Sequence, residues 1–274
     1  SIRYVKECYA ANESLKDVKL IREVVVNDLD EAAVEQAHEN VRFNQMDPNI
    51  VRPQHGDALD TMYAVRGKNN EEKFDVIDLD PYGSAAPFLD AAVQAVSSGG
   101  LLCVTCTDMV VLGGSHPETC FGRYRAMPMP NARYLHELAL RILLQTIEAK
   151  ANTYGRTIKP IISVGMAFYI RVFVEIHDNK AGVISSSLRV GHVYQSIQCP
   201  SFFTVAQGSL RKNTYIPSRG PPVSVCEETG SCFKIAGPVW LGELHDFDVV
   251  DGKCMSCGGC TIEAHTPPPP RSPH

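Results

Sequence analysis

Short apolar runs alternate with amphipathic stretches through the first 108 residues of the chain. Runs of apolar and β-branched residues, the pattern of buried strands, lie at 23–28, 50–53, 74–79 and 101–108. Apolar residues at helical spacing lie at 2–9, 32–43, 59–65 and 84–97, the last followed by Gly99 and Gly100. Strands that alternate with helices predict an α/β fold with a doubly wound, mostly parallel sheet.

The pattern changes after residue 110. Residues 111–130 are rich in Gly and Pro and are expected to form a loop, and the longest helix is expected to open at Asn131. Two β runs, 161–166 and 171–176, predict an antiparallel pair that ends the sheet. Short strands at 193–206 and 232–240 predict a small β-rich α+β appendage.

We therefore divide the chain into three parts. Residues 1–178 are expected to form the α/β domain, and residues 179–250 the appendage. Residues 251–274 are rich in Cys and Gly in their first half and contain a proline run in their second, which predicts a disordered tail.

Composition and charge limit the function only weakly. The net charge is −5, whereas a protein that binds nucleic acid usually carries a basic surface. Basic residues nevertheless outnumber acidic ones between residues 120 and 160, and they form either a solvated helix face or a face for phosphates. These residues are Arg123, Arg125, Arg133, Arg141, Lys150, Arg156 and Lys159. Cysteines inside apolar strands, such as Cys103 and Cys106, indicate reduced thiols and an intracellular protein, and no run is apolar and long enough to cross a membrane.

Acidic residues stand at the ends of four predicted strands: Asp28, Asp57, Asp80 and Asp108. One such residue commonly caps a helix, but four along one sheet edge predict a cleft lined by carboxylates. In open α/β sheets, ligands bind beyond the carboxyl ends of the strands, and an acid there binds ribose hydroxyls. The pattern fits an adenosyl cofactor, and the absence of a Walker phosphate loop disfavours phosphoryl transfer.

The sequence Asp80-Pro81-Tyr82 follows the central strand. A carboxylate there can accept a hydrogen bond from an exocyclic amine, and an aromatic ring can stack on a planar base. These residues are candidates for catalysis on an amino group, although an acid, a proline and an aromatic residue also occur together in ordinary turns at strand ends.

Several longer motifs, in order, resemble the tRNA (guanine26-N2)-dimethyltransferase family over residues 1–249. They are Ser1-Ile2-Arg3-Tyr4, Asp78-Leu79-Asp80-Pro81-Tyr82-Gly83-Ser84, Phe88-Leu89-Asp90-Ala91-Ala92, Thr105-Cys106-Thr107-Asp108, His136-Glu137-Leu138-Ala139-Leu140-Arg141-Ile142 and Gly237-Pro238-Val239-Trp240-Leu241-Gly242. The resemblance implies a Rossmann-like class I methyltransferase domain that uses S-adenosylmethionine and an appendage that helps to hold tRNA. The product would be N2,N2-dimethylguanosine between the D and anticodon stems.

The resemblance also implies roles for single residues. Arg3 and Asp28 match the family's cofactor-binding arginine and ribose-binding aspartate, and Asp57 with Ala58 matches the pair that contacts adenine. Asp80, Pro81 and Tyr82 match the catalytic acid-Pro-aromatic site. Asp108 and His136 lie in matching motifs, but we assign them no role, and His136 is expected to be packed or on the surface.

The chain departs from the family at its start. The first strand of the family fold and its glycine-containing cofactor turn would precede Ser1, in the middle of the sheet between the strands that end at Asp28 and Asp80. Without that strand, its two neighbours must close up or leave a groove of unpaired backbone. We therefore expect an incomplete chain without activity of its own.

A second departure concerns zinc. The eukaryotic members of the family carry two Cys-x-x-Cys pairs, but here the pairs read Ser196-Ile197-Gln198-Cys199 and Cys226-Glu227-Glu228-Thr229. We expect Cys199 and Cys226 to approach each other, with Cys232 as a substitute ligand, but we expect no zinc because two thiolates are too few. The cysteines of 254–260 have ligand spacing but match nothing in the family.

Two other functions remain open, a binding protein that holds tRNA without modifying it and an amino-methyltransferase that acts on adenine or a protein amide. In each of the tRNA readings the partner is tRNA, with no membrane and no obligate protein partner. The compartment would be the nucleus, the cytoplasm or a mitochondrion.

Overall fold

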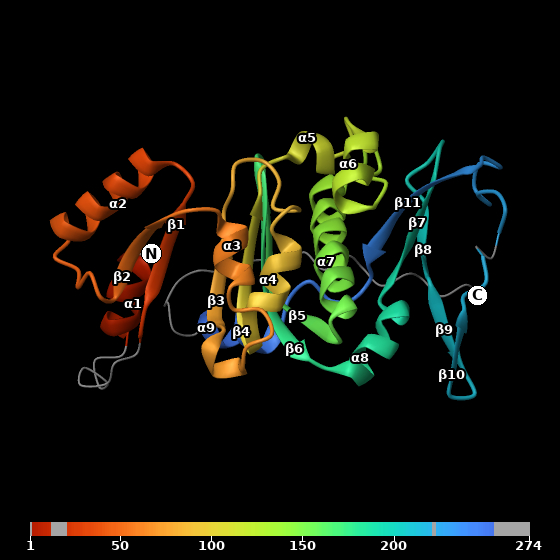
Figure 1. The fold of residues 1–274 in the computed structure, drawn as a ribbon. Helices are drawn as coiled ribbons and strands as arrows, with labels where there is room; N and C mark the ends of the chain where they lie inside the picture. The colour runs from red at the N-terminus through yellow and green to blue at the C-terminus, as the bar shows by residue number, and fades with distance from the viewer. Residues whose placement is uncertain (1, 12–20, 221–222, 255–274) are drawn as a thin grey trace.

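The computed structural model describes residues 2–11, 21–220 and 223–254 (Figure 1). The α/β part contains, in chain order, α1 Ile2–Ala11, β1 Val24–Asp28, α2 Glu31–Phe43, β2 Val51–His55, α3 Ala58–Tyr63, β3 Phe74–Leu79, α4 Leu89–Ala95, β4 Val96–Cys106, α5 Met109–Leu112, α6 Pro117–Tyr124, α7 Leu135–Thr153, β5 Arg156–Met166 and β6 Tyr169–Asp178. Asp30 caps α2 by accepting the Ala32 N–H, and Asp57 caps α3 by accepting the Leu59 N–H. The alternation of helices and strands confirms the predicted α/β class.

The strands of this part form two separate sheets. β1 and β2 pair in parallel, while the larger sheet has the order β3-β4-β6-β5, with β3 and β4 parallel and β6 antiparallel to both of its neighbours. The antiparallel pair of β5 and β6 was predicted. β1 and β3 do not pair within the described structure, so a gap in the backbone ladder remains, which is the second of the two outcomes expected at this point.

Helix α1 connects the two sheets through side chains. Val5 packs with Val41 and Val51 beside the small sheet, while the Tyr4 hydroxyl donates a hydrogen bond to Asp78 on β3. Two guanidinium bonds from Arg171 on β6, at 2.9 and 3.0 Å, also reach Asp78. The hydrogen bond to the Asp78 carboxylate raises the pKa of Tyr4 to about 12, so the Tyr4 hydroxyl stays protonated and continues to donate. Asp78 is therefore a structural carboxylate.

Several boundaries differ from the prediction, among them the start of β5, which lies at Arg156 and not at residue 161. The alanine-rich helix ends at Ala95, not Ser97, because residues 96–100 extend β4 along β3 and β6. Gly99, with φ 82°, lies inside this strand and does not end a helix. Residues 111–130 are not a single loop, since α6 and the end of α5 lie there, and α7 begins at Leu135.

The appendage is β-rich, as predicted. It contains α8 Lys180–Ile184, β7 Val190–Ser196, β8 Phe202–Ala206, β9 Gly208–Arg211, β10 Thr214–Pro217, β11 Phe233–Trp240 and α9 Phe247–Cys254. The order β11-β7-β8 forms its main sheet, and β9 and β10 form a hairpin. Val193, Val239 and Trp240 belong to the same hydrophobic cluster as α7, so this sheet shares the core of the α/β part.

The division at residue 178 is therefore a change from one sheet to another and not a break in the packing. Of the predicted tail, residues 251–254 form the end of α9, and residues 255–274 lie outside the described residues.

Candidate active site

The acid-Pro-aromatic sequence forms an exposed turn at the carboxyl end of β3. Asp80 is exposed, and the Tyr82 ring is fully accessible at 105% relative exposure, which leaves both for a ligand. Gly83 follows with φ 79°, a conformation that favours glycine. Two hydrogen bonds of 2.8 Å fix the turn to the end of β4, one from the Gly83 N–H to the Thr107 hydroxyl and one from the Thr107 N–H to the Gly83 carbonyl. The side chains of the turn are thus exposed, while its backbone is fixed by hydrogen bonds to Thr107.

A buried group of polar side chains supports the turn from behind. The Tyr124 hydroxyl donates to the Asp108 carboxylate at 2.9 Å, and Ser84, the residue after the turn, lies 2.7 Å from the same hydroxyl. Burial, followed by the neighbouring Cys106 and Asp108, raises the pKa of Tyr124 far above its usual value, so the hydroxyl remains a donor. Arg123 completes the group with a 2.9 Å ion pair to Asp108. Asp108, which had no assigned role, therefore positions the turn.

Asp28 and Asp57 lie together at the carboxyl edge of the small sheet. Because β1 and β2 are parallel, both strands end at the same edge, and the Gly56 N–H bonds the Asp28 carbonyl at 3.0 Å. Both carboxylates are exposed and use Oδ1 for one backbone N–H each, that of Asp30 and that of Leu59. The same-edge placement of these two acids is confirmed. A shared cleft for Asp28, Asp57 and Asp80 stays a prediction.

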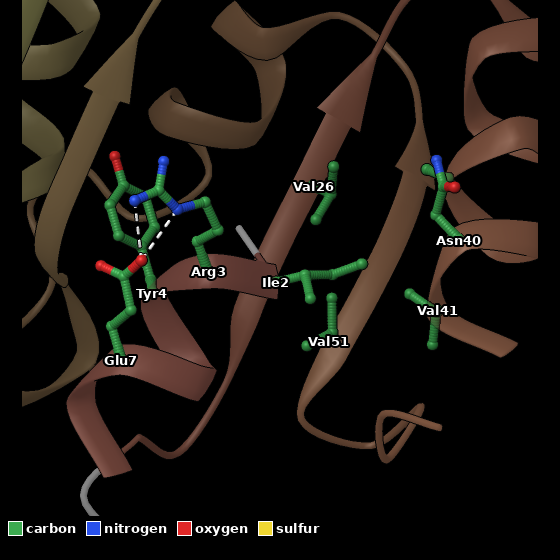
Figure 2. Close-up of a pocket in the computed structure, with 9 residues that line it drawn as sticks. Ile2, Arg3, Tyr4, Glu7, Val26, Asn40, Val41 and Val51 are labelled. Carbon is green, nitrogen blue, oxygen red and sulfur yellow. Dashed lines mark hydrogen bonds and ion pairs between the residues drawn. The ribbon is translucent and has the colours of Figure 1, made fainter. Parts of the chain in front are cut away.

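Arg3 lies on α1 beside a cavity of about 640 Å³ next to the small sheet (Figure 2). Ile2, Val26, Val41 and Val51 form its apolar part, and Figure 2 shows the guanidinium of Arg3 turned towards Glu7 and Tyr4. Arg3 pairs with Glu7 at 2.8 Å, and both side chains are exposed. The described lining of the cavity does not include Asp28, Asp57 or Ala58, so the structure does not join Arg3 to the other predicted cofactor residues in one pocket.

Most of the basic residues between 120 and 160 have structural partners. Arg156 is buried and binds Asp178 at 2.7 Å, Lys159 binds Asp246 at 2.6 Å, and Arg141 binds Glu137 at 2.9 Å. Arg125 and Arg133 are exposed and form no ion pair within the described part of the chain. The excess of positive charge in the sequence is thus much smaller at the surface.

Residues 2–257 match the family described as N2,N2-dimethylguanosine tRNA methyltransferase. The chain belongs to this family. It is 45% identical over 240 residues to the tRNA (guanine(26)-N(2))-dimethyltransferase of Mus musculus, which covers 85% of this chain and 36% of the mouse protein. The mitochondrial enzyme of Saccharomyces cerevisiae is 37% identical over 246 residues, with 86% and 43% coverage. The chain therefore spans less than half the length of these two relatives.

A solved structure has the same fold. Trm1 from Pyrococcus horikoshii, determined with S-adenosyl-L-methionine, is 28% identical and superposes with a TM-score of 0.69, covering 84% of this chain and 58% of that chain. This similarity confirms the class I methyltransferase fold expected from the sequence. Among the described residues, no helix is long and apolar enough to cross a membrane.

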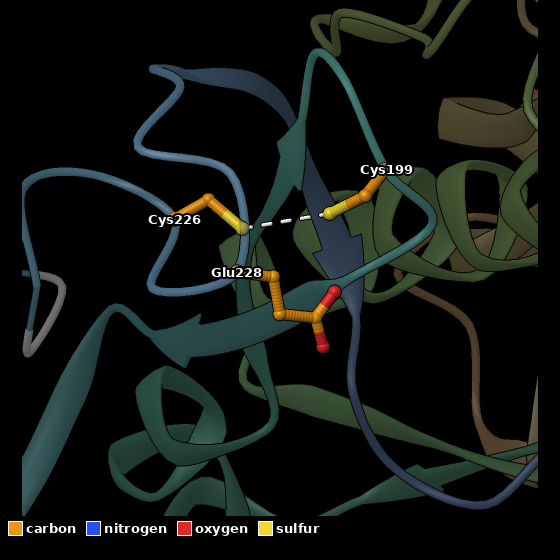
Figure 3. Close-up of side chains that lie close together, drawn as sticks. All are labelled: Cys199, Cys226 and Glu228. Atoms are coloured by element: carbon orange, nitrogen blue, oxygen red, sulfur yellow. Dashed lines mark hydrogen bonds between the residues drawn. The ribbon is translucent and has the colours of Figure 1, made fainter.

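In this family member, the two altered cysteine pairs still meet (Figure 3). Cys199 and Cys226 lie with their sulfur atoms 3.4 Å apart, which confirms the expected approach. Hydrogen bonds from Thr229 and Ser196, which stand where the resemblance led us to expect cysteines, lower the pKa of Cys226 to about 7. The third possible metal ligand nearby is Glu228, within 4.8 Å of both thiols, and not the exposed Cys232.

These donors fit a structural zinc site poorly. Tetrahedral structural zinc takes four thiolate or imidazole ligands, whereas two of the four positions here are neutral hydroxyls. Glu228 also accepts a hydrogen bond from Ser201 at 2.9 Å. Hydrogen bonds from the two hydroxyl groups satisfy the Cys226 thiol.

We expect metal analysis of the purified full-length protein to find well below one zinc per chain. The physical reason is the shortage of charged ligands, since a third or fourth thiolate is absent from the described cluster. The double variant Cys199→Ser with Cys226→Ser is the matched control and should have the same zinc content. One tightly held zinc per wild-type chain that is lost in the double variant would contradict the expectation.

The positioning residues were missed in the sequence. In the sequence, Thr107 stands out only as part of a motif, and Tyr124 lies in a segment expected to be a loop. These residues are far apart in the sequence, so no local pattern points to them. Ser84, Asp108 and Tyr124 meet only when β3, β4 and α6 are packed. His136, expected to be packed or on the surface, is partly buried on α7 next to Gly165 of β5.

Proposed function

We propose that the full-length protein containing this chain is an S-adenosylmethionine-dependent tRNA (guanine26-N2)-dimethyltransferase. The observation that supports this most strongly is the exposed Asp80-Pro81-Tyr82 turn, held in place by Thr107 and by the group around Asp108. A protein that only bound RNA would not need an exposed carboxylate on a rigid turn at the ligand edge of the sheet.

The adenosyl part of the cofactor would lie at the edge of the small sheet. Asp28 and Asp57 each engage one oxygen with a backbone N–H, and their second oxygens suit a ribose hydroxyl and the adenine amine. Ala58 would contact the adenine ring, and Arg3 would bind the carboxylate of the methionine part. S-adenosylmethionine supplies an electrophilic methyl group to the site.

Asp80 would act on the amine of the substrate. Its carboxylate accepts a hydrogen bond from the guanine N2 amine, turns the nitrogen lone pair towards the methyl group and takes up the released proton. Tyr82, with a fully exposed ring, would stack on the guanine after it leaves the helical stack. Pro81 stiffens the turn between them.

The rest of the chain would serve the same substrate. The appendage, residues 179–250, would help to hold tRNA, and it is joined to α7 through shared core residues. An intracellular compartment that contains tRNA follows from this substrate: the nucleus, the cytoplasm or a mitochondrion.

The test is transfer of labelled methyl groups to tRNA transcripts by the full-length protein. We expect label in a transcript with guanosine at the junction of the D and anticodon stems, and none when adenosine replaces it. Nucleoside analysis should give N2,N2-dimethylguanosine. Equal labelling of both transcripts would contradict the substrate, and tight tRNA binding without transfer would show a binding protein.

A further inference from the structure

An open groove of about 640 Å³ is lined by Tyr82 and the residues after it and by residues of α6 and α7 (Figure 1 shows α6 at one end of α7). Pro87, Arg123, Arg125, Gln145 and Lys150 contribute to its lining. Its volume is in the range of sites that hold small organic groups such as a nucleotide. The groove therefore continues the proposed active site along the surface of the helices.

The floor of the groove contains an unpartnered polar group. Gln145 on α7 is only 8% exposed, and its Oε1 accepts no hydrogen bond within the described structure. An unsatisfied buried amide oxygen costs about 1–3 kcal/mol, so such a group without a ligand is unusual. Thr146 beside it is satisfied, since its hydroxyl bonds the Ile142 carbonyl at 2.8 Å. Gln145 lines the groove but its Oε1 is covered, so a rotation of the side chain would present this unpaired acceptor to an N–H or O–H donor in the groove.

The rim of the groove carries positive charge. Arg125 is exposed at the end of α6, lies over the Phe121 ring at 5.9 Å and has no ion pair within the described structure. Arg123 is bound to Asp108 at 2.9 Å, and Lys150 is 3.9 Å from Asp90, a loose contact. Arg125 is therefore the cation on this rim that remains available for an external anion.

We propose that this groove binds the RNA nucleotide next to the target guanosine, with its backbone phosphate on Arg125 and its base edge on Gln145. The proposal rests on the proposed function, because Tyr82 stands both at the mouth of the groove and in the catalytic turn. An aromatic ring, an unpaired guanidinium and a buried amide acceptor together match the stacking face, the phosphate and the donor groups of a single-stranded nucleotide. Lys150 adds charge for the following phosphate.

The test measures tRNA binding by the full-length protein at several salt concentrations, with unmodified transcript as the probe. Arg125→Ala is expected to raise the Kd several-fold and to reduce the slope of log Kd against log salt by about 0.7–1, the value for one lost phosphate contact. Gln145→Met is expected to raise the Kd with no change in slope and no loss of thermal stability, since it removes an unpaired group. Arg133→Ala, which removes an exposed arginine outside the groove, is the matched control.

The outcomes separate the groove from the function. Equal effects of Arg125→Ala and Arg133→Ala on both Kd and slope, with an active wild-type protein, would overturn the groove and leave the function standing. A destabilised Gln145→Met variant with unchanged tRNA affinity would show a packing role and also overturn it. If the wild-type protein transfers no methyl group and binds no tRNA, both proposals fall. Affinity for S-adenosylmethionine should be the same in all variants.

Discussion

Asp80→Asn is expected to reduce methylation of unmodified tRNA by the full-length protein by a factor on the order of a hundred or more. Asparagine keeps the shape and one acceptor oxygen but removes the negative charge and the site that takes up the proton. Losses of this size are typical of a positioned acid or base. Binding of S-adenosylmethionine should change little, because in the proposal it depends on Asp28, Asp57 and Arg3.

The measurement is single-turnover transfer of labelled methyl groups, with calorimetry for cofactor binding. Asp75→Asn, an exposed carboxylate at the other end of β3, is the matched control and should keep near-normal turnover. Asp78, although nearer, is unsuitable because it holds Tyr4 and Arg171. Near-normal turnover by Asp80→Asn would contradict the mechanism.

Much of the candidate site could be predicted from local sequence. Asp28, Asp57 and Asp80 each stand at or within two residues of the end of a strand, and the carboxyl ends of paired parallel strands share an edge. The pairing of β1 with β2 then places Asp28 beside Asp57 without further information. Local pattern was sufficient because the signal, an acid after a strand, lies within a few residues.

The support for the site could not be predicted in this way. Thr107 holds the turn of Asp80 only because β4 lies beside β3, and Tyr124 reaches Asp108 only because α6 folds back over the end of β4. The end of α4 was misjudged for a related reason, since residues 96–100 follow the pairing offered by β3 and β6 and not their own helical spacing. Tertiary pairing determined these details.

β1 and β3 do not pair within the described structure, and α1 bridges the gap between their two sheets. β3 is an edge strand within the described structure, and Val76 on it is 54% exposed. Tyr4 reaches from α1 to Asp78, and this contact ties the helix that carries Arg3 to β3, the strand before the Asp80 turn. The position of α1 therefore affects Arg3 and β3 together.

Glu148→Leu is expected to destabilise the protein by about 3–5 kcal/mol, a loss typical of removing one partner of a buried ion pair. Glu148 lies on α7 with no exposed surface. Its carboxylate accepts the Ile158 N–H at 2.9 Å, the Arg189 guanidinium at 3.0 Å and the Ser186 hydroxyl. Leucine fills a similar volume but leaves these three donors without their acceptor, and two of the four residues lie in the appendage, so its attachment should weaken as well.

The measurement is urea unfolding of the full-length protein at neutral pH, with the midpoint and slope compared between variants. Glu137→Leu, on the same helix, removes an ion pair with Arg141 in which the Glu137 side chain is 46% exposed, and should cost no more than about 1 kcal/mol. Glu148→Gln should lie between the two, because an amide oxygen can still accept the Ile158 N–H while the charge opposite Arg189 is lost. If Glu148→Leu lowered the free energy of unfolding as little as Glu137→Leu, the three donors would have to form hydrogen bonds to water once the carboxylate is gone. It would also mean that α7 and the appendage are held together by apolar packing alone.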